Sequence, residues 1–239
     1  MSRDDEFFAK GIAALRGGDI QADLPLVDGG PRWGVSAVMR PGREAITALS
    51  DVGAEAAALA GAGHWLHGEP SMHVTLRGFE PHSVRDFSGD EHIARYIAAI
   101  DAAAAASTPI TVTFRGVAPH RGGVLALIDH SGDTPEAIHG NLVAAVEEAG
   151  HPDYETDFHR DIWYASLLHF AGTVIAPEAL AVWGEYHRDR LITSSRLDVI
   201  ELVRWRYTGK GVSAETVHSA PIGGLDGAVE DLSETARLN

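Results

Sequence analysis

The sequence predicts an α+β fold that contains an internal duplication. The chain has 239 residues, 45% hydrophobic and 22% charged, so it can bury the core of one large domain or of two small lobes. The order strand, helix and β-hairpin occurs twice in succession along it. In both units a histidine lies near one end of the first strand, which a chance repetition of common elements does not explain. We therefore interpret the two units as duplicates.

The segment before the first unit is predicted to begin with a helix. Ser2 can cap this helix and Gly17 can end it, so residues 1–32 are interpreted as an N-terminal helical extension. A loop rich in glycine, proline and aspartate follows this helix. After the loop come a strand at 33–40 and a helix at 43–60.

The two units follow within a domain predicted at 33–223. The first comprises a strand at 71–79, a helix at about 89–106 and hairpin strands at 110–117 and 123–129. A connecting helix begins at Thr134 and Pro135 and ends at Gly150. The second comprises a strand at 162–172, a helix at 177–190 and hairpin strands at 196–204 and 214–221. A helical tail is predicted at 224–239.

The first histidine strand, SMHVTLRGF, carries a polar face. Because side chains alternate along a strand, His73, Thr75 and Arg77 are predicted to share one side. An imidazole, a hydroxyl and a guanidinium in one row suit an anion such as phosphate. The alternative is a solvated strand face that happens to carry a histidine.

Both histidine strands resemble the motifs of the two-histidine (2H) phosphoesterases, which include 2′-5′ RNA ligase-like proteins and cyclic nucleotide phosphodiesterases. His73-Val74-Thr75-Leu76 matches the His-x-Thr/Ser motif of this superfamily, and His169-Phe170-Ala171 matches it with alanine in place of the hydroxyl residue. The resemblance covers about 33–223. It includes a closing hairpin that runs from Leu202-Val203-Arg204 through Lys210-Gly211 to Ala220-Pro221-Ile222-Gly223.

The resemblance implies a two-lobed, pseudo-symmetric fold in which antiparallel sheets line a central cleft and helices lie outside. It implies that His73 and His169 alternate as general base and general acid, with no metal or other cofactor, in hydrolysing a nucleotide-derived cyclic phosphate or a 2′-5′ phosphodiester. Thr75, backbone N–H groups and Arg77 would then stabilise the charge on the phosphorus centre. Which histidine is the base stays open.

Further residues are candidates for substrate contact, each with a structural alternative. Ala171 aligns with the second histidine, and its missing hydroxyl would weaken the anion site or mark a catalytically silent binder of a nucleotide or phosphorylated metabolite. Arg115 points into the cleft or solvates an outer face. Trp163 stacks on a base or packs in the core. Tyr207 and Lys210 contact substrate at the cleft mouth or belong to a turn.

The other histidines and acids are assigned structural roles. The cluster His151, Asp153, Asp157, His159 and Asp161 has metal-binding chemistry but no recognised spacing, so a polar loop is favoured over a metal-dependent enzyme. Surface positions are predicted for His64, His67, His82, His92 and His187.

Composition limits the partners. Nineteen basic and 34 acidic residues give a net charge of −15, which opposes binding of long nucleic acid but leaves a small nucleotide or RNA end as substrate. An acidic start, no long apolar run and no cysteine predict a cytoplasmic protein without membrane contact. Motifs typical of serine hydrolases, NTPases, zincins and dinucleotide-binding enzymes are absent from the sequence.

Overall fold

The computed structural model describes residues 3–150, 155 and 160–223, so the predicted tail at 224–239 lies outside the described residues. The helices are α1 (Arg3–Gly17), α2 (Arg43–Ala60), α3 (Glu91–Ala105), α4 (Glu136–Glu148) and α5 (Pro177–Tyr186). The strands are β1 (Ser36–Met39), β2 (Trp65–Leu66), β3 (Val74–Gly78), β4 (Ile110–His120), β5 (Gly123–Ile128), β6 (Tyr164–His169), β7 (Leu191–Leu197), β8 (Val199–Tyr207) and β9 (Val212–Pro221). The predicted α+β class is confirmed.

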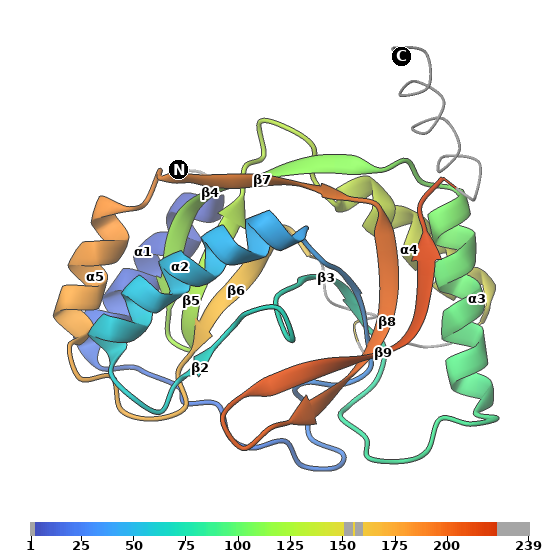
Figure 1. Ribbon diagram of the computed structural model, residues 1–239, viewed down its shortest axis with the longest axis horizontal. Helices are drawn as coiled ribbons and strands as arrows, with labels where there is room; N and C mark the ends of the chain where they lie inside the picture. The colour runs from blue at the N-terminus through green and yellow to red at the C-terminus, as the bar shows by residue number, and fades with distance from the viewer. Residues whose placement is uncertain (1–2, 151–154, 156–159, 224–239) are drawn as a thin grey trace, which may run out of the picture.

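The strands form one antiparallel sheet that curls strongly (Figure 1). Its order is β7-β4-β5-β6-β3-β1-β8-β9, and the short β2 pairs with β6. One half, β7-β4-β5-β6, meets the other, β3-β1-β8-β9, where β3 pairs with β6 through Val74 and Ala165. The predicted antiparallel strands are present, joined in a single sheet, while the internal duplication stays a prediction.

The helices divide between the two halves of the sheet (Figure 1). α1, α2 and α5 pack on the half that contains β4 to β7, and α3 and α4 pack on the other half. The apolar faces of α2 and α3 explain this packing, because each buries residues spaced three or four positions apart, such as Leu49, Val52 and Ala56 in α2. The ends of β3 and β6 that carry the histidines therefore lie at the junction of the two halves.

The N-terminal helix is part of the main hydrophobic core. Phe8, Ile12 and Leu15 of α1 are buried in the same core cluster as the sheet. Gly11 allows this close packing, because a Cβ at this position would lie 1.8 Å from the carbonyl oxygen of Pro119 in β4. Backbone hydrogen bonds hold the segment between α1 and β1 to the β4–β5 turn and to the residue after β6.

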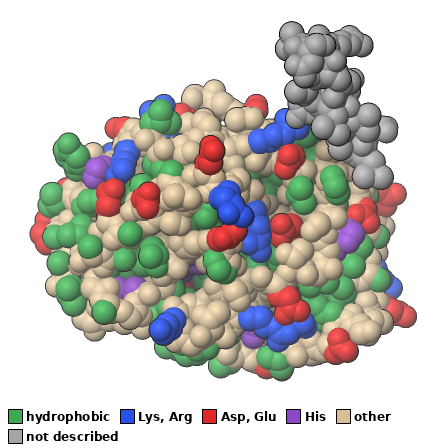
Figure 2. Space-filling view, viewed as in Figure 1, with side chains coloured by type: hydrophobic (Ala, Val, Ile, Leu, Met, Phe, Trp, Pro, Cys, Tyr) green, Lys and Arg blue, Asp and Glu red, His purple; other side chains and the backbone are tan. Residues whose placement is uncertain are grey.

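The surface shown in Figure 2 carries basic side chains interspersed with acidic ones. Ion pairs in the described residues include Arg40 with Glu201 and Arg43 with Glu69. Within the described ranges, no helix has both the length and the apolar character needed to cross a membrane.

Candidate active site

His73 and His169 come together at the junction of the two sheet halves. His73 directly precedes β3 and His169 ends β6, and these two strands are antiparallel neighbours. β2 continues along β6, so that Trp65 pairs with His169. The pairing of β3 with β6 therefore brings two residues far apart in the sequence to one region.

Two tryptophan rings connect the two histidines. The ring of His73 lies 4.5 Å from that of Trp205, measured between centroids, and Trp205 lies 5.1 Å from Trp33. The ring of Trp33 in turn meets His169 edge-on at 4.9 Å. Both histidines are buried, His73 with 9% and His169 with 5% of its surface exposed. They thus belong to one aromatic-lined site.

A third histidine, His67, forms part of the same site. Its Nε2 shares a hydrogen bond of 2.7 Å with Nδ1 of His169, and its backbone N–H donates to the carbonyl of Leu167 in β6. The predicted surface position of His67 is wrong, because the pairing of β2 with β6 buries the residue. The predicted surface position of His82 is also wrong, because this buried ring donates from Nδ1 to the carbonyl of Trp33 at 3.0 Å.

The tautomer of neutral His73 is fixed by its backbone. Its Nδ1 donates to the carbonyl oxygen of Ser71 at 2.7 Å, so Nε2 carries a lone pair. Burial lowers the pKa of His73 to about 4, against the opposing effect of the Ser71 carbonyl; the charges of Arg40 and Arg160 lower it further. His73 is therefore neutral at pH 7 and has a basic nitrogen available.

The other two site histidines are also neutral at pH 7. Burial, followed by the charge of His73, lowers the pKa of His67 to about 3. Burial lowers the pKa of His169 well below its usual range, and the charge of neighbouring His67 acts in the same direction. Positive charge in this site is costly until an anion enters it.

Asp23 places a carboxylate beside His169. Its Oδ2 lies 3.8 Å from Nε2 of His169, and its Oδ1 pairs with Arg32 at 2.9 Å. Burial raises the pKa of Asp23, and the charge of Arg32 opposes this shift. The segment between α1 and β1, predicted only as a loop, thus contributes an acid to the site.

Trp33 adopts a left-handed backbone conformation with φ of 60°. For a bulky residue this conformation costs about 1–2 kcal/mol, and such strain is found most often at functional sites. The hydrogen bond from His82 to its carbonyl holds the conformation. The strained backbone directs the indole toward His169 and Trp205.

A bulge in β3 separates Thr75 from Arg77. In the pairing with β1, Thr75 is opposite Val38 and Arg77 is opposite Ala37, so Leu76 is an extra residue between them. Adjacent residues of β1 face opposite sides of the sheet, and their partners do the same. The predicted single polar face is therefore wrong beyond Thr75.

Arg77 is buried and forms a hydrogen bond with Glu155. Its guanidinium donates to the carbonyl of Glu155 at 3.3 Å, and the carboxylate of Glu155 accepts from Arg160 at 2.9 Å. Because Arg160 acts on the pKa of His73, this cluster lies close to the site. In the predicted metal cluster, Asp161 pairs with Arg3, and His151, Asp153, Asp157 and His159 lie outside the described residues.

A second bulge, in β6, separates Trp163 from His169. The register with β5 shifts between Ser166 and Leu168, so Leu167 is the extra residue. Trp163 and His169, which strict alternation would place together, consequently lie on opposite faces. Trp163 packs in the hydrophobic core, the structural alternative given above.

Arg115 and Ala171 lie in two different places. Arg115 donates to Asp129 at 2.8 Å and lines a surface hollow with α1 residues such as Asp5 and Phe8. Ala171 follows the end of β6, and its backbone N–H donates to Nδ1 of His64 at 3.2 Å. Of the two, Ala171 is the one beside the histidine site.

A hollow of about 490 Å³ adjoins Ala171. Asp23, Trp65, Tyr207 and Lys210 also line it, and the rings of Trp65 and Tyr207 lie 5.7 Å apart. Since Asp23 is next to His169, the hollow lies beside the His169 side of the site. Tyr207 and Lys210 are predicted at the cleft mouth or in a turn. Tyr207 ends β8, Lys210 lies in the β8–β9 turn, and both line this hollow.

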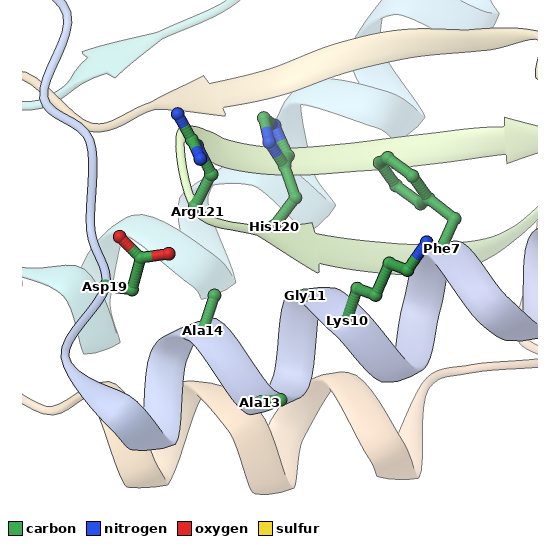
Figure 3. Close-up of a pocket in the computed structure, with 8 residues that line it drawn as sticks. All are labelled: Phe7, Lys10, Gly11, Ala13, Ala14, Asp19, His120 and Arg121. Atoms are coloured by element: carbon green, nitrogen blue, oxygen red, sulfur yellow. The ribbon is translucent and has the colours of Figure 1, made fainter.

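Another hollow, of about 690 Å³, lies between α1 and the β4–β5 turn (Figure 3). Phe7 and Lys10 line it from α1, His120 lines it from the end of β4, and Arg121 lines it from the turn. The turn adjoins the histidine site because Gly123, at its end, pairs with His169.

The fold is similar to that of several solved structures. TT0787 of Thermus thermophilus aligns with a TM-score of 0.55 and 16% identity, over 80% of this chain and 98% of that chain. A crystal structure of a phosphoesterase aligns with a TM-score of 0.53 and 11% identity, over 80% and 98% of the two chains. E. coli LigT complexed with 3′-AMP aligns with a TM-score of 0.52 and 10% identity, over 80% of this chain and 98% of that chain.

No model of a known protein family matches this sequence. No curated protein matches it either. The solved structures thus carry the comparison, and at these identities they concern the fold. The protein has the fold of TT0787, of the phosphoesterase and of E. coli LigT, and this agrees with the α+β fold that the resemblance of its two histidine strands implied.

Proposed function

We propose that this protein is a metal-independent phosphoesterase that uses His73 and His169 to hydrolyse a nucleotide-derived cyclic phosphate or a 2′-5′ phosphodiester. The observation that carries the proposal is that these two histidines lie in one buried, aromatic-lined site. The LigT-like fold supports the reaction class, and LigT itself has been crystallised with phosphate and with 3′-AMP.

His73 is suited to the role of general base. Its Nδ1 proton is committed to the Ser71 carbonyl, so Nε2 can take a proton from water as the water attacks phosphorus. Because burial holds the pKa of His73 at about 4, the free base predominates at neutral pH. A bound phosphate raises this pKa and makes the proton transfer more favourable.

The cations near His73 favour an anionic substrate. Arg40 and Arg160 both act on its pKa through their positive charge, although each is paired with a glutamate. Thr75, on the strand that follows His73, is partly buried and carries a hydroxyl. These groups are suited to stabilising the negative charge that develops on the phosphorus centre.

The hollow beside Ala171 is suited to the part of the substrate beyond the scissile phosphate. Its volume of about 490 Å³ lies in the range of small-molecule sites. Trp65 and Tyr207 offer aromatic faces for a nucleobase, and Lys210 offers a positive charge for a further phosphate. A nucleotide therefore fits the chemistry of this hollow.

The competing function is that of a catalytically silent binder of a nucleotide or phosphorylated metabolite. Ala171 supports it, because the position has no hydroxyl to bond the phosphate. Loss of one hydrogen bond to a charged group weakens a site by about 1.5–3 kcal/mol, which catalysis can tolerate. Turnover, rather than affinity, separates the two functions.

A panel of 2′,3′-cyclic nucleotides, 3′,5′-cyclic nucleotides and 2′-5′ dinucleotides, assayed with and without EDTA, tests the proposal. We expect hydrolysis of at least one class at the same rate in both conditions, since two imidazoles supply the proton transfers. Activity that EDTA abolishes and a divalent ion restores would instead support a metal-dependent enzyme. Binding without hydrolysis would support the silent binder.

Ala171→Thr is expected to raise kcat/KM by up to about 10-fold with little change in substrate affinity. The added hydroxyl would strengthen a contact to charge that develops mainly in the transition state. Steady-state kinetics on one accepted substrate measures this effect, with Ala171→Val as a control that adds similar volume without a hydroxyl. Equal loss of activity in both variants would show that the space above Ala171 serves substrate fit.

A further inference from the structure

Asp23 is a buried carboxylate fixed beside His169. Its backbone N–H donates to the carbonyl of Phe170 at 2.6 Å, which ties it to the residue after the histidine. Only 5% of Asp23 is exposed, and burying a carboxylate is costly unless its charge is met. Arg32 meets one oxygen, Oδ1, at 2.9 Å.

The second oxygen faces the imidazole. Oδ2 of Asp23 is buried, has no hydrogen-bond partner in the described part of the chain and lies 3.8 Å from Nε2 of His169. The opposite nitrogen of His169, Nδ1, is held by His67 at 2.7 Å. Each nitrogen of His169 therefore has a specific neighbour.

In either arrangement of the hydrogen bond to His67, one proton lies between Asp23 and His169. If His67 donates to Nδ1, neutral His169 carries its own proton on Nε2, facing the carboxylate. If Nδ1 donates instead, Nε2 has a lone pair, and the carboxyl group must carry the proton to avoid two facing acceptors. The raised pKa of Asp23, caused by burial, is consistent with this sharing.

We propose that Nδ1 of His169 donates to His67 and that Asp23 is a positioning residue that shares a second proton with Nε2 of His169, so that His169 serves as the general acid of the reaction. This inference rests on the proposed function. As water attacks phosphorus, one of its protons moves to Nε2 of His73. The bond from phosphorus to the leaving oxygen breaks, and that oxygen takes the proton that Asp23 and Nε2 of His169 share. This leaves a carboxylate beside a neutral imidazole, whose own proton stays on Nδ1. His73 then releases its proton, and the Asp23–His169 pair takes one up, through solvent.

Groups from several elements face His169. They are His67 after β2, His73 before β3, His120 at the end of β4, and Asp23 with Arg32 between α1 and β1. Within this described set Asp23 is the acid, and the other groups carry positive charge or none. Removing its negative charge should therefore lower the pKa of His169.

Asp23→Asn tests the proposal by keeping the shape and removing the charge. We expect kcat to fall by about 10- to 100-fold with KM nearly unchanged. This loss is smaller than the whole contribution of a general acid, because His169 itself remains. The decline of kcat at high pH, where the acid loses its proton, should move to lower pH. Asp23→Glu should restore part of the rate, and Asp19→Asn is a matched control on the same segment.

NMR titration of histidine side-chain nitrogens gives a readout independent of turnover. The pKa of His169 should be lower in Asp23→Asn than in the wild type, and the pKa of His73 should be unchanged. Identical His169 titrations in both proteins would overturn the inference, even if His169 proves essential for hydrolysis. A shifted titration in a protein that hydrolyses no substrate would support the pair and contradict the proposed function alone.

Discussion

Replacing His73 or His169 by alanine is expected to lower kcat by about 10²- to 10⁴-fold, because each removes one of the two proton transfers. The two residues lie in one site, so the substitutions should remove steps of a single reaction. KM should change much less, since the imidazoles act mainly on the transition state. Initial rates on the best substrate of the panel measure both parameters.

His92→Ala is the control for this prediction, since His92 is exposed on α3. It should keep the wild-type rate. Histidine variants of the site that hydrolyse as fast as the wild type would contradict the catalytic role. A change in affinity alone, with turnover at background in all proteins, would identify the silent binder.

The free energy of unfolding is expected to fall steeply as the pH drops from about 6.5 to 4. In this window the unfolded chain binds protons on its histidines, whereas burial keeps His73 neutral down to a pKa of about 4 and His67 down to about 3. For His73 the shift corresponds to roughly 3 kcal/mol at the acid end of the window. Asp23 acts in the opposite direction, because its raised pKa favours proton uptake by the folded state.

Urea unfolding at a series of pH values measures this dependence. His67→Gln is the matched variant, because the glutamine amide can donate to or accept from Nδ1 of His169 but does not titrate. Its stability should depend less on pH than that of the wild type. A wild-type stability that stays constant from pH 7 to pH 4.5 would contradict the neutral, buried state of these imidazoles.

The helices and most strands could be predicted from the sequence because periodicity and end signals are local. The helix predicted at 43–60 and the helix predicted at about 89–106 are present as α2 and α3. The orientation of side chains along the histidine strands was less predictable. It depends on the bulges at Leu76 and Leu167, which arise from pairing with partner strands and leave no mark in a single strand's alternation.

The residues that surround the two histidines also could not be predicted from local sequence patterns. His67 reaches the site because β2 pairs with the end of β6, a contact between residues about 100 positions apart. Asp23 reaches it through a backbone bond to Phe170. The segment HWLH did indicate that His67 is buried, because its histidines flank two apolar residues. This pattern is unusual for an exposed loop.

Phosphorus-31 NMR of a 2′,3′-cyclic nucleotide incubated with the metal-free protein tests the central claim most directly. We predict that the resonance of the cyclic phosphate disappears and that of one phosphomonoester replaces it, with the conversion slowed about 10²- to 10⁴-fold in His73→Ala and His169→Ala. A cyclic phosphate that binds, shown by a shifted or broadened resonance, and stays unhydrolysed would contradict the account. The same test on a 2′-5′ dinucleotide covers the second linkage in the proposal.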